Sequence, residues 1–69
     1  SRMYVSHRRL GLVTAVNISD PGSLQKVWQL DSHGNPGLVV EDKDMIVVPA
    51  GRGGLRLYRK SNGLPYYGN

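Results

Sequence analysis

The chain contains no cysteine, no phenylalanine and no long apolar run. Without cysteine it has neither disulfides nor thiolate metal sites, which suits a reducing compartment, so we expect a cytoplasmic protein. No segment approaches the roughly 18 apolar residues of a membrane span, and no charged-then-apolar start resembles a signal peptide. We therefore expect no membrane partner, and we expect the aromatic part of any core to come from Trp28 and the tyrosines.

The chain also has few groups suited to metal binding or catalysis. His7 and His33 are far apart in the sequence and fit no metal-ligand spacing. The acidic segment 41–44 lacks the Asp-x-Asp-x-Asp-Gly pattern of a calcium loop, so we interpret it as a solvated turn. No serine lies in a nucleophile motif, and the glycine-rich segment 51–54 lacks the lysine of a phosphate loop. We therefore expect a protein that is not an enzyme and that takes no metal, cofactor or small-molecule substrate.

Its net charge of +4 is unevenly distributed along the chain. Residues 1–9 carry three arginines and no acid, and residues 51–60 carry three arginines and one lysine, again with no acid. All five acids lie between these segments, accompanied there by only two lysines. Basic ends around a mildly acidic middle are suited to contact with a polyanion such as nucleic acid, or with an acidic protein surface.

Short β-type segments separated by turn residues dominate the rest of the sequence. The clearest is residues 10–18, where apolar and β-branched residues fill both alternating faces and Gly11 permits a bulge at the start. The other strand candidates are residues 3–5, 26–31, 38–41, 45–48 and 55–60. The run 45–48 is continuously apolar, which predicts a strand buried on both faces, and Trp28 is expected in the core.

The turns between these segments predict how the strands connect. Asp20-Pro21-Gly22 is turn chemistry, because proline fixes φ and glycine accepts positive φ. The glycine- and proline-rich segment 32–37 lies between two strand candidates, which predicts a β-hairpin over residues 26–41. The charged connector 41–44 has room for one turn of 3₁₀ helix. Residues 61–69 are expected to form an extended tail.

The order of these segments resembles a small SH3-like barrel of the KOW or Tudor type. In those modules a Gly-x-Val-x-x-Val strand precedes a Val-x-Trp hairpin, and here Gly-Leu-Val-Thr-Ala-Val at 11–16 precedes Val-Trp-Gln-Leu at 27–30. The resemblance covers about forty residues and its motifs are generic to the superfold. The stretch lacks the clustered aromatics of a methyl-lysine cage. It also lacks the polar pore strand of the plasmid-borne dihydrofolate reductases built on this barrel type.

We therefore expect an all-β fold with one small SH3-like barrel of about five strands over residues 1–60 and a tail over 61–69. The resemblance implies binding of RNA, DNA, ribonucleoprotein or protein tails through loops at one barrel end. The residues that we expect to contact such a partner are basic or aromatic: Arg8, Arg9, Arg52, Arg56, Tyr58, Arg59 and Lys60. The alternative for residues 51–60 is a solvated tail, or a last strand whose arginines lie in water.

Two functions are compatible with this sequence. The first is a nucleic-acid-binding or ribonucleoprotein-associated accessory module, in which the basic ends contact phosphates and Tyr58, Tyr66 and Tyr67 stack on bases. The second is a structural or assembly protein, such as a subunit of a homo-oligomer or of a phage-type particle. In that case the apolar and tyrosine-bearing ends would pack on neighbouring copies. The thin core of so short a chain favours a partner of some kind.

Overall fold

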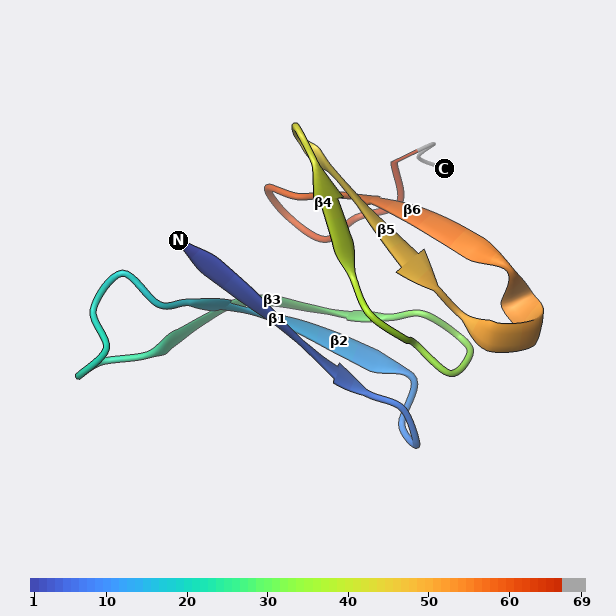
Figure 1. Cartoon of the computed structure of the whole chain (residues 1–69), viewed down its shortest axis with the longest axis horizontal. Helices are drawn as coiled ribbons and strands as arrows, with labels where there is room; N and C mark the ends of the chain where they lie inside the picture. Colours follow the sequence, from blue (N-terminus) through green and yellow to red (C-terminus); the bar gives the residue numbers. More distant parts are fainter. Residues whose placement is uncertain (67–69) are drawn as a thin grey trace.

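Two antiparallel three-stranded sheets make up the molecule, which confirms the all-β prediction (Figure 1). The structure is a computed structural model and describes residues 1–66. The strands are β1 (Arg2–His7), β2 (Leu12–Asn17), β3 (Gln25–Asp31), β4 (Val40–Asp42), β5 (Met45–Pro49) and β6 (Leu55–Arg59). One sheet has the order β1-β2-β3 and the other β4-β5-β6. Within residues 1–66 no helix is long and apolar enough to cross a membrane.

The predicted hairpin over residues 26–41 is wrong. β3 pairs with β2, and β4 pairs with β5, so the two strands of the expected hairpin belong to different sheets. The segment between them crosses from one sheet to the other instead of reversing in place. Ser6 Oγ donates a hydrogen bond to the Gly37 carbonyl oxygen (2.8 Å), and Gly37 N donates one to the Pro49 carbonyl oxygen (2.8 Å). The crossing segment therefore contacts a strand of each sheet.

Three further expectations differ from the structure. There are six strands among the described residues, and they form two sheets without a detected closed barrel. The 3₁₀ turn is η1 (Gly51–Gly53), directly before β6, whereas residues 43 and 44 form the tight turn between β4 and β5. Lys43 has a φ of 55° there. The irregularity in β2 falls between Ala15 and Val16, not at Gly11.

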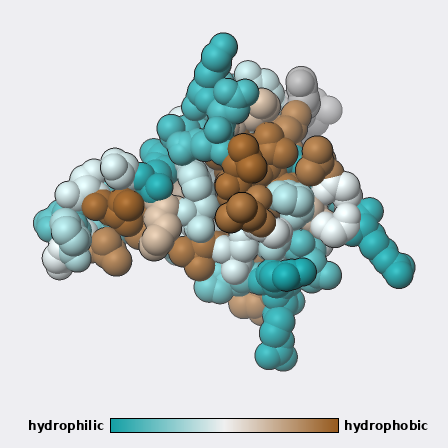
Figure 2. All heavy atoms as spheres, in the orientation of Figure 1, coloured by the Kyte–Doolittle hydropathy of each residue, from teal (hydrophilic) through white to brown (hydrophobic). Residues whose placement is uncertain are grey.

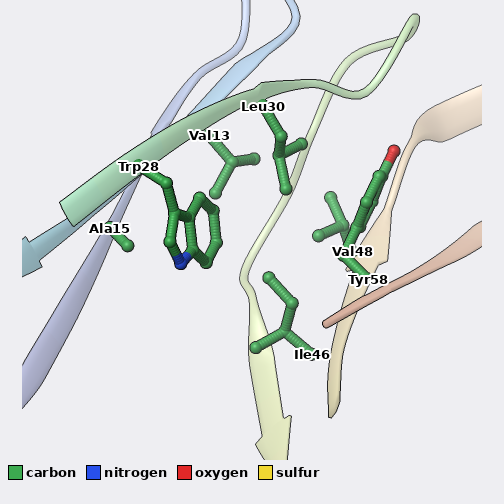
Figure 3. Close-up of a cluster of buried hydrophobic side chains, with 7 residues drawn as sticks. All are labelled: Val13, Ala15, Trp28, Leu30, Ile46, Val48 and Tyr58. Atoms are coloured by element: carbon green, nitrogen blue, oxygen red, sulfur yellow. The ribbon is translucent and has the colours of Figure 1, made fainter. Parts of the chain in front are cut away.

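The core lies between the two sheets, where their inner faces meet (Figure 3). Its members are Val13, Ala15, Trp28, Leu30, Ile46, Val48 and Tyr58. Strand alternation selects them, because residues two apart on a strand share a face. Trp28 is only 8% exposed, which confirms it as a core residue. Tyr4 packs against this cluster, and its ring centroid lies 6.0 Å from that of Trp28.

The last strand is followed by a segment that folds back along it. Gly63 N and Arg59 N donate hydrogen bonds to the carbonyl oxygens of Arg59 and Leu64 (both 2.8 Å). Pro65 forms an isolated bridge with Tyr58, and Tyr66 N donates a hydrogen bond to the Leu57 carbonyl oxygen (2.9 Å). Residues 55–59 are thus a strand, and residues 61–66 contact it. The rest of the expected tail, residues 67–69, lies outside the described residues.

Candidate polyanion-binding site

The turn between β1 and β2 presents Arg8 and Arg9 to solvent. Leu10 N and Gly11 N both donate hydrogen bonds to the His7 carbonyl oxygen (3.1 and 2.9 Å), which closes a tight turn. Gly11 has a φ of 76°, a conformation that glycine adopts without strain. Both arginines are exposed. The turn therefore fixes two neighbouring cations at the end of the first sheet.

A second connection packs directly against this turn through small residues. Ser32 is fully buried, and its N and Oγ both donate hydrogen bonds to the Gly11 carbonyl oxygen (2.7 and 2.8 Å). A Cβ on Gly11 would lie 2.9 Å from the carbonyl oxygen of Gly34. A Cβ on Gly34 would lie 2.5 Å from the carbonyl oxygen of Ala50, immediately before η1. Because Gly11 and Gly34 have no side chain, three connections can touch at one end of the molecule.

The third of these connections is η1, which carries the exposed Arg52. Ala50 N donates a hydrogen bond to the Gly54 carbonyl oxygen (2.8 Å), and Gly54 N donates one to the Gly51 carbonyl oxygen (3.0 Å). These bonds hold the turn against residue 50 and hence against the neighbouring connection. We call this end, made of residues 8–11, 32–37 and 50–54, the loop end. It brings together the connections that carry Arg8, Arg9 and Arg52.

A groove beside the loop end runs between β3 and β6 and is lined in part by Asp31, His33 and Arg56. Its volume is about 740 Å³. Arg56 is half-buried, and its Nε is buried without a hydrogen-bond partner among the described residues. Asp31 supplies a negative charge nearby: its Oδ1 accepts a hydrogen bond from His33 N (2.9 Å) and lies 3.8 Å from His33 Nδ1. Arg56 thus belongs to the same end as the loop arginines, beside one acid.

Two of the expected contact residues, Arg59 and Lys60, lie at the other end of β6. Lys60 Nζ is 2.8 Å from Glu41 Oε2. The Arg59 guanidinium lies 5.2 Å from the Tyr66 ring centroid and donates a hydrogen bond to the Tyr66 carbonyl oxygen (3.3 Å). About five residues of strand, or roughly 16 Å, separate them from the η1 side of the sheet. The basic segment 51–60 is therefore divided between two ends of the molecule.

Tyr58 occupies the core and is only 6% exposed. Burial raises the pKa of its hydroxyl above the usual 10.0. A ring in this position has little free face for a base, so the placement favours a packing role over stacking. Tyr66 is half-buried beside Arg59, and Tyr67 lies outside the described residues.

Sequence reasoning missed the residues that assemble the loop end. Residues 32–37 were expected only to reverse the chain, but Ser32 and Gly34 join the two arginine-bearing connections. Their only signal in the sequence is a small residue in a glycine-rich segment, which is also typical of an ordinary turn. No group of three His, Asp or Glu side chains that could hold a metal ion occurs within residues 1–66. The chemistry available at the loop end is charge attraction and hydrogen bonding to an anion.

Comparisons with known proteins identified no relative of this chain. No protein-family model matches the chain, and neither a curated protein nor a solved structure matches it.

Proposed function

We propose that the protein is a non-enzymatic module that binds nucleic acid through the loop end. The observation that carries the proposal is the contact of three connections through Gly11, Gly34 and Ala50. Because of this contact, the exposed Arg8, Arg9 and Arg52 lie at one end of the molecule. Arginine suits such a site, because its planar guanidinium donates several hydrogen bonds to phosphate oxygens.

The proposed binding is largely independent of base sequence. Exposed arginines on short turns contact phosphates, which position a nucleic acid without reading its bases. With Tyr58 in the core, the loop end, residues 8–11, 32–37 and 50–54, carries no tyrosine, tryptophan or phenylalanine, and its aromatic ring is the exposed imidazole of His33. The fold that we propose for this module is SH3-like, with the two three-stranded sheets as its halves and the groove between β3 and β6 as its open side. The shared core and the strand order support this interpretation.

A salt titration tests the proposal. We expect a labelled single-stranded oligonucleotide of mixed sequence to bind at low salt, measured by fluorescence anisotropy. Releasing counterions from about four phosphates, one for each of Arg8, Arg9, Arg52 and Arg56, predicts a slope of about −3 in log K against log salt. Removal of Arg8 and Arg9 together, or of Arg52, by substitution with alanine should lower the magnitude of this slope by about 0.7 per arginine.

Lys26→Ala is the matched control, because it removes one exposed cation that lies outside the loop end. If binding depends only on net charge, Lys26→Ala will weaken it as much as Arg52→Ala. We expect Lys26→Ala to leave the slope unchanged. No binding at low salt, or equal effects of the two substitutions, would overturn the proposal.

A further inference from the structure

The outer face of the β4-β5-β6 sheet is largely apolar, and the contacts on it from other described segments lie at its margins, where Gly37 approaches Pro49 and Arg59 packs against Tyr66. Residues of β5 that alternate with the buried Ile46 and Val48 are Met45, Val47 and Pro49, and all three are half-buried. The register places three cross-strand rows on this face: Val40–Val47–Leu57, Asp42–Met45–Arg59 and Pro49–Leu55. Directly opposite residues in an antiparallel pair share a face. Two charged residues therefore lie in one row, and the other two rows are apolar.

Several side chains of this face are open to solvent. Val40 is 54% exposed and Leu55 is 71% exposed, and Leu38, just before β4, is 84% exposed. Figure 2 shows apolar residues gathered near the middle of the view, in the region of β4 and β5. The continuous apolar run 45–48 is typical of a strand covered on both faces, yet this structure covers only one of them. An uncovered apolar sheet face of this kind marks an interaction surface.

We propose that this face binds the same face of a second copy of the chain, forming a two-fold symmetric dimer. The charges in the Asp42–Met45–Arg59 row are the reason for proposing a second copy as the partner of this face. With a two-fold axis running approximately along β5, β4 of one copy lies over β6 of the other. In each of two symmetry-related contacts, Asp42 of one copy then faces Arg59 of the other. Met45 faces Met45 of the other copy, and Val40 faces Leu57 of the other copy. The face is thus complementary to itself in both charge and hydrophobicity.

Other arrangements of the two copies lose this match. A two-fold axis across the strands would place Asp42 and Arg59 over the apolar row that contains Pro49 and Leu55. Both charges would then be covered without a partner, which is costly. Among the described residues, Arg59 packs over the Tyr66 ring and donates one N–H to the Tyr66 carbonyl oxygen, and a guanidinium has further N–H donors for a partner. This surface is also distinct from the loop end, so the dimer does not depend on nucleic-acid binding.

The small area of the face predicts a weak dimer. Two strands of five residues and one of three, about 4.8 Å apart, cover at most roughly 14 by 17 Å. That is below the roughly 800 Å² per partner of a standard interface, so we expect dissociation in the micromolar to millimolar range. Sedimentation equilibrium over that range of protein concentration should fit a monomer–dimer equilibrium. Concentration-dependent amide shifts in NMR spectra should be confined to β4, β5 and β6.

Substitutions on the outer face should weaken the dimer without unfolding the chain. We expect Val40→Lys to raise the dimer Kd about tenfold or more, because each dimer gains two desolvated charges opposite Leu57. Val47→Thr keeps a β-branched side chain and should raise the Kd several-fold. Leu24→Lys is the matched control, because Leu24 is 57% exposed in the loop before β3, away from this face. Circular dichroism checks that each variant is folded.

A charge swap tests the geometry itself. Asp42→Arg places two arginines at each contact, and Arg59→Asp places two aspartates there, so each variant alone should dimerise more weakly than the unchanged chain. When the two variants are mixed, every contact is again between an arginine and an aspartate, and a heterodimer should form. A chain that stays monomeric at millimolar concentration overturns the proposal. So do open-ended aggregates, self-association unaffected by Val40→Lys, or variants that fail to pair when mixed.

Discussion

The two ends of the strand framework carry cations in different surroundings. At the loop end, Arg8, Arg9 and Arg52 are exposed and form no salt bridge with any described residue. At the opposite end, Lys60 pairs with Glu41, and its carbonyl oxygen accepts hydrogen bonds from Trp28 Nε1 (2.8 Å) and from the guanidinium of Arg2. The first end holds cations that are available to a ligand. At the second end, the hydrogen bonds to the Lys60 carbonyl oxygen connect the end of β6 to β1 and β3.

This difference shows what charge counting along a sequence leaves out. Both basic segments were expected to contact phosphates, but a cation bound to its own chain has less to gain from a phosphate. The two ends are also assembled differently. The loop end depends on glycines that let backbones approach, whereas the opposite end depends on an aromatic ring and hydrogen bonds to one carbonyl group. Substitutions can therefore disturb one end and leave the other in place.

The largest effect that we expect comes from Trp28→Ala, which removes the anchor of the end opposite the loop end. A Cβ on Gly63 would lie 2.7 Å from Trp28 Cε3, so the segment after β6 packs tightly on the indole. Loss of the ring and of its hydrogen bond to Lys60 should cost about 3–5 kcal/mol in the free energy of unfolding. Urea denaturation followed by circular dichroism measures the change. For so short a chain, this loss is a large part of its total stability.

Trp28→Phe distinguishes the contribution of the aromatic ring to stability from that of the hydrogen bond to Lys60. Phenylalanine retains most of the apolar volume but has no donor for the Lys60 carbonyl oxygen, so we expect an intermediate loss. If Trp28→Ala costs no more than Trp28→Phe, the ring is not the anchor of this end.

The second effect is specific to the loop end. Gly34→Ala would place a methyl group 2.5 Å from the Ala50 carbonyl oxygen and 3.1 Å from the Ala50 Cβ, so the two connections must separate. We expect a destabilisation of about 1–3 kcal/mol, together with a smaller salt slope for oligonucleotide binding. Gly37→Ala in the same connection is the control, because its Cβ would approach no heavy atom closer than 3.6 Å. Equal effects of the two substitutions would show that the contact at Gly34 does not organise the loop end.

The sequence predicted local structure better than it predicted strand pairing. Alternating residues correctly placed the segments that became β2 and β3, and the continuous apolar run 45–48 correctly placed β5. Asp20-Pro21-Gly22 forms the expected turn, with Asp20 Oδ1 accepting a hydrogen bond from Gly22 N (3.0 Å). The hairpin over residues 26–41 was wrong because glycine and proline mark a change of direction but not the sheet in which the next strand pairs. That choice depends on which apolar faces meet in the core.

The candidate site was predictable only as a set of basic segments. That Arg8, Arg9 and Arg52 lie on touching connections follows from backbone contacts at Gly11 and Gly34, which no local pattern specifies. The pairing of Lys60 with Glu41 likewise joins the residue after β6 to a residue of β4. The role of the arginines in binding stays a prediction, and so does a domain boundary after residue 60.

The smallest effect that we expect comes from Glu41→Gln, which releases Lys60 at the end opposite the loop end. Both side chains are about one-third exposed (36% for Lys60 and 35% for Glu41), so the loss of the pair should cost at most about 1 kcal/mol. Burial raises the pKa of Tyr4, and the Glu41 carboxylate adds to this, so the pKa of Tyr4 should fall in the variant. Asp44→Asn removes an exposed acid that forms no salt bridge with the described residues. If only the loop end binds nucleic acid, both variants will change the oligonucleotide affinity equally, whereas a larger gain for Glu41→Gln would show that Lys60 also contacts phosphate.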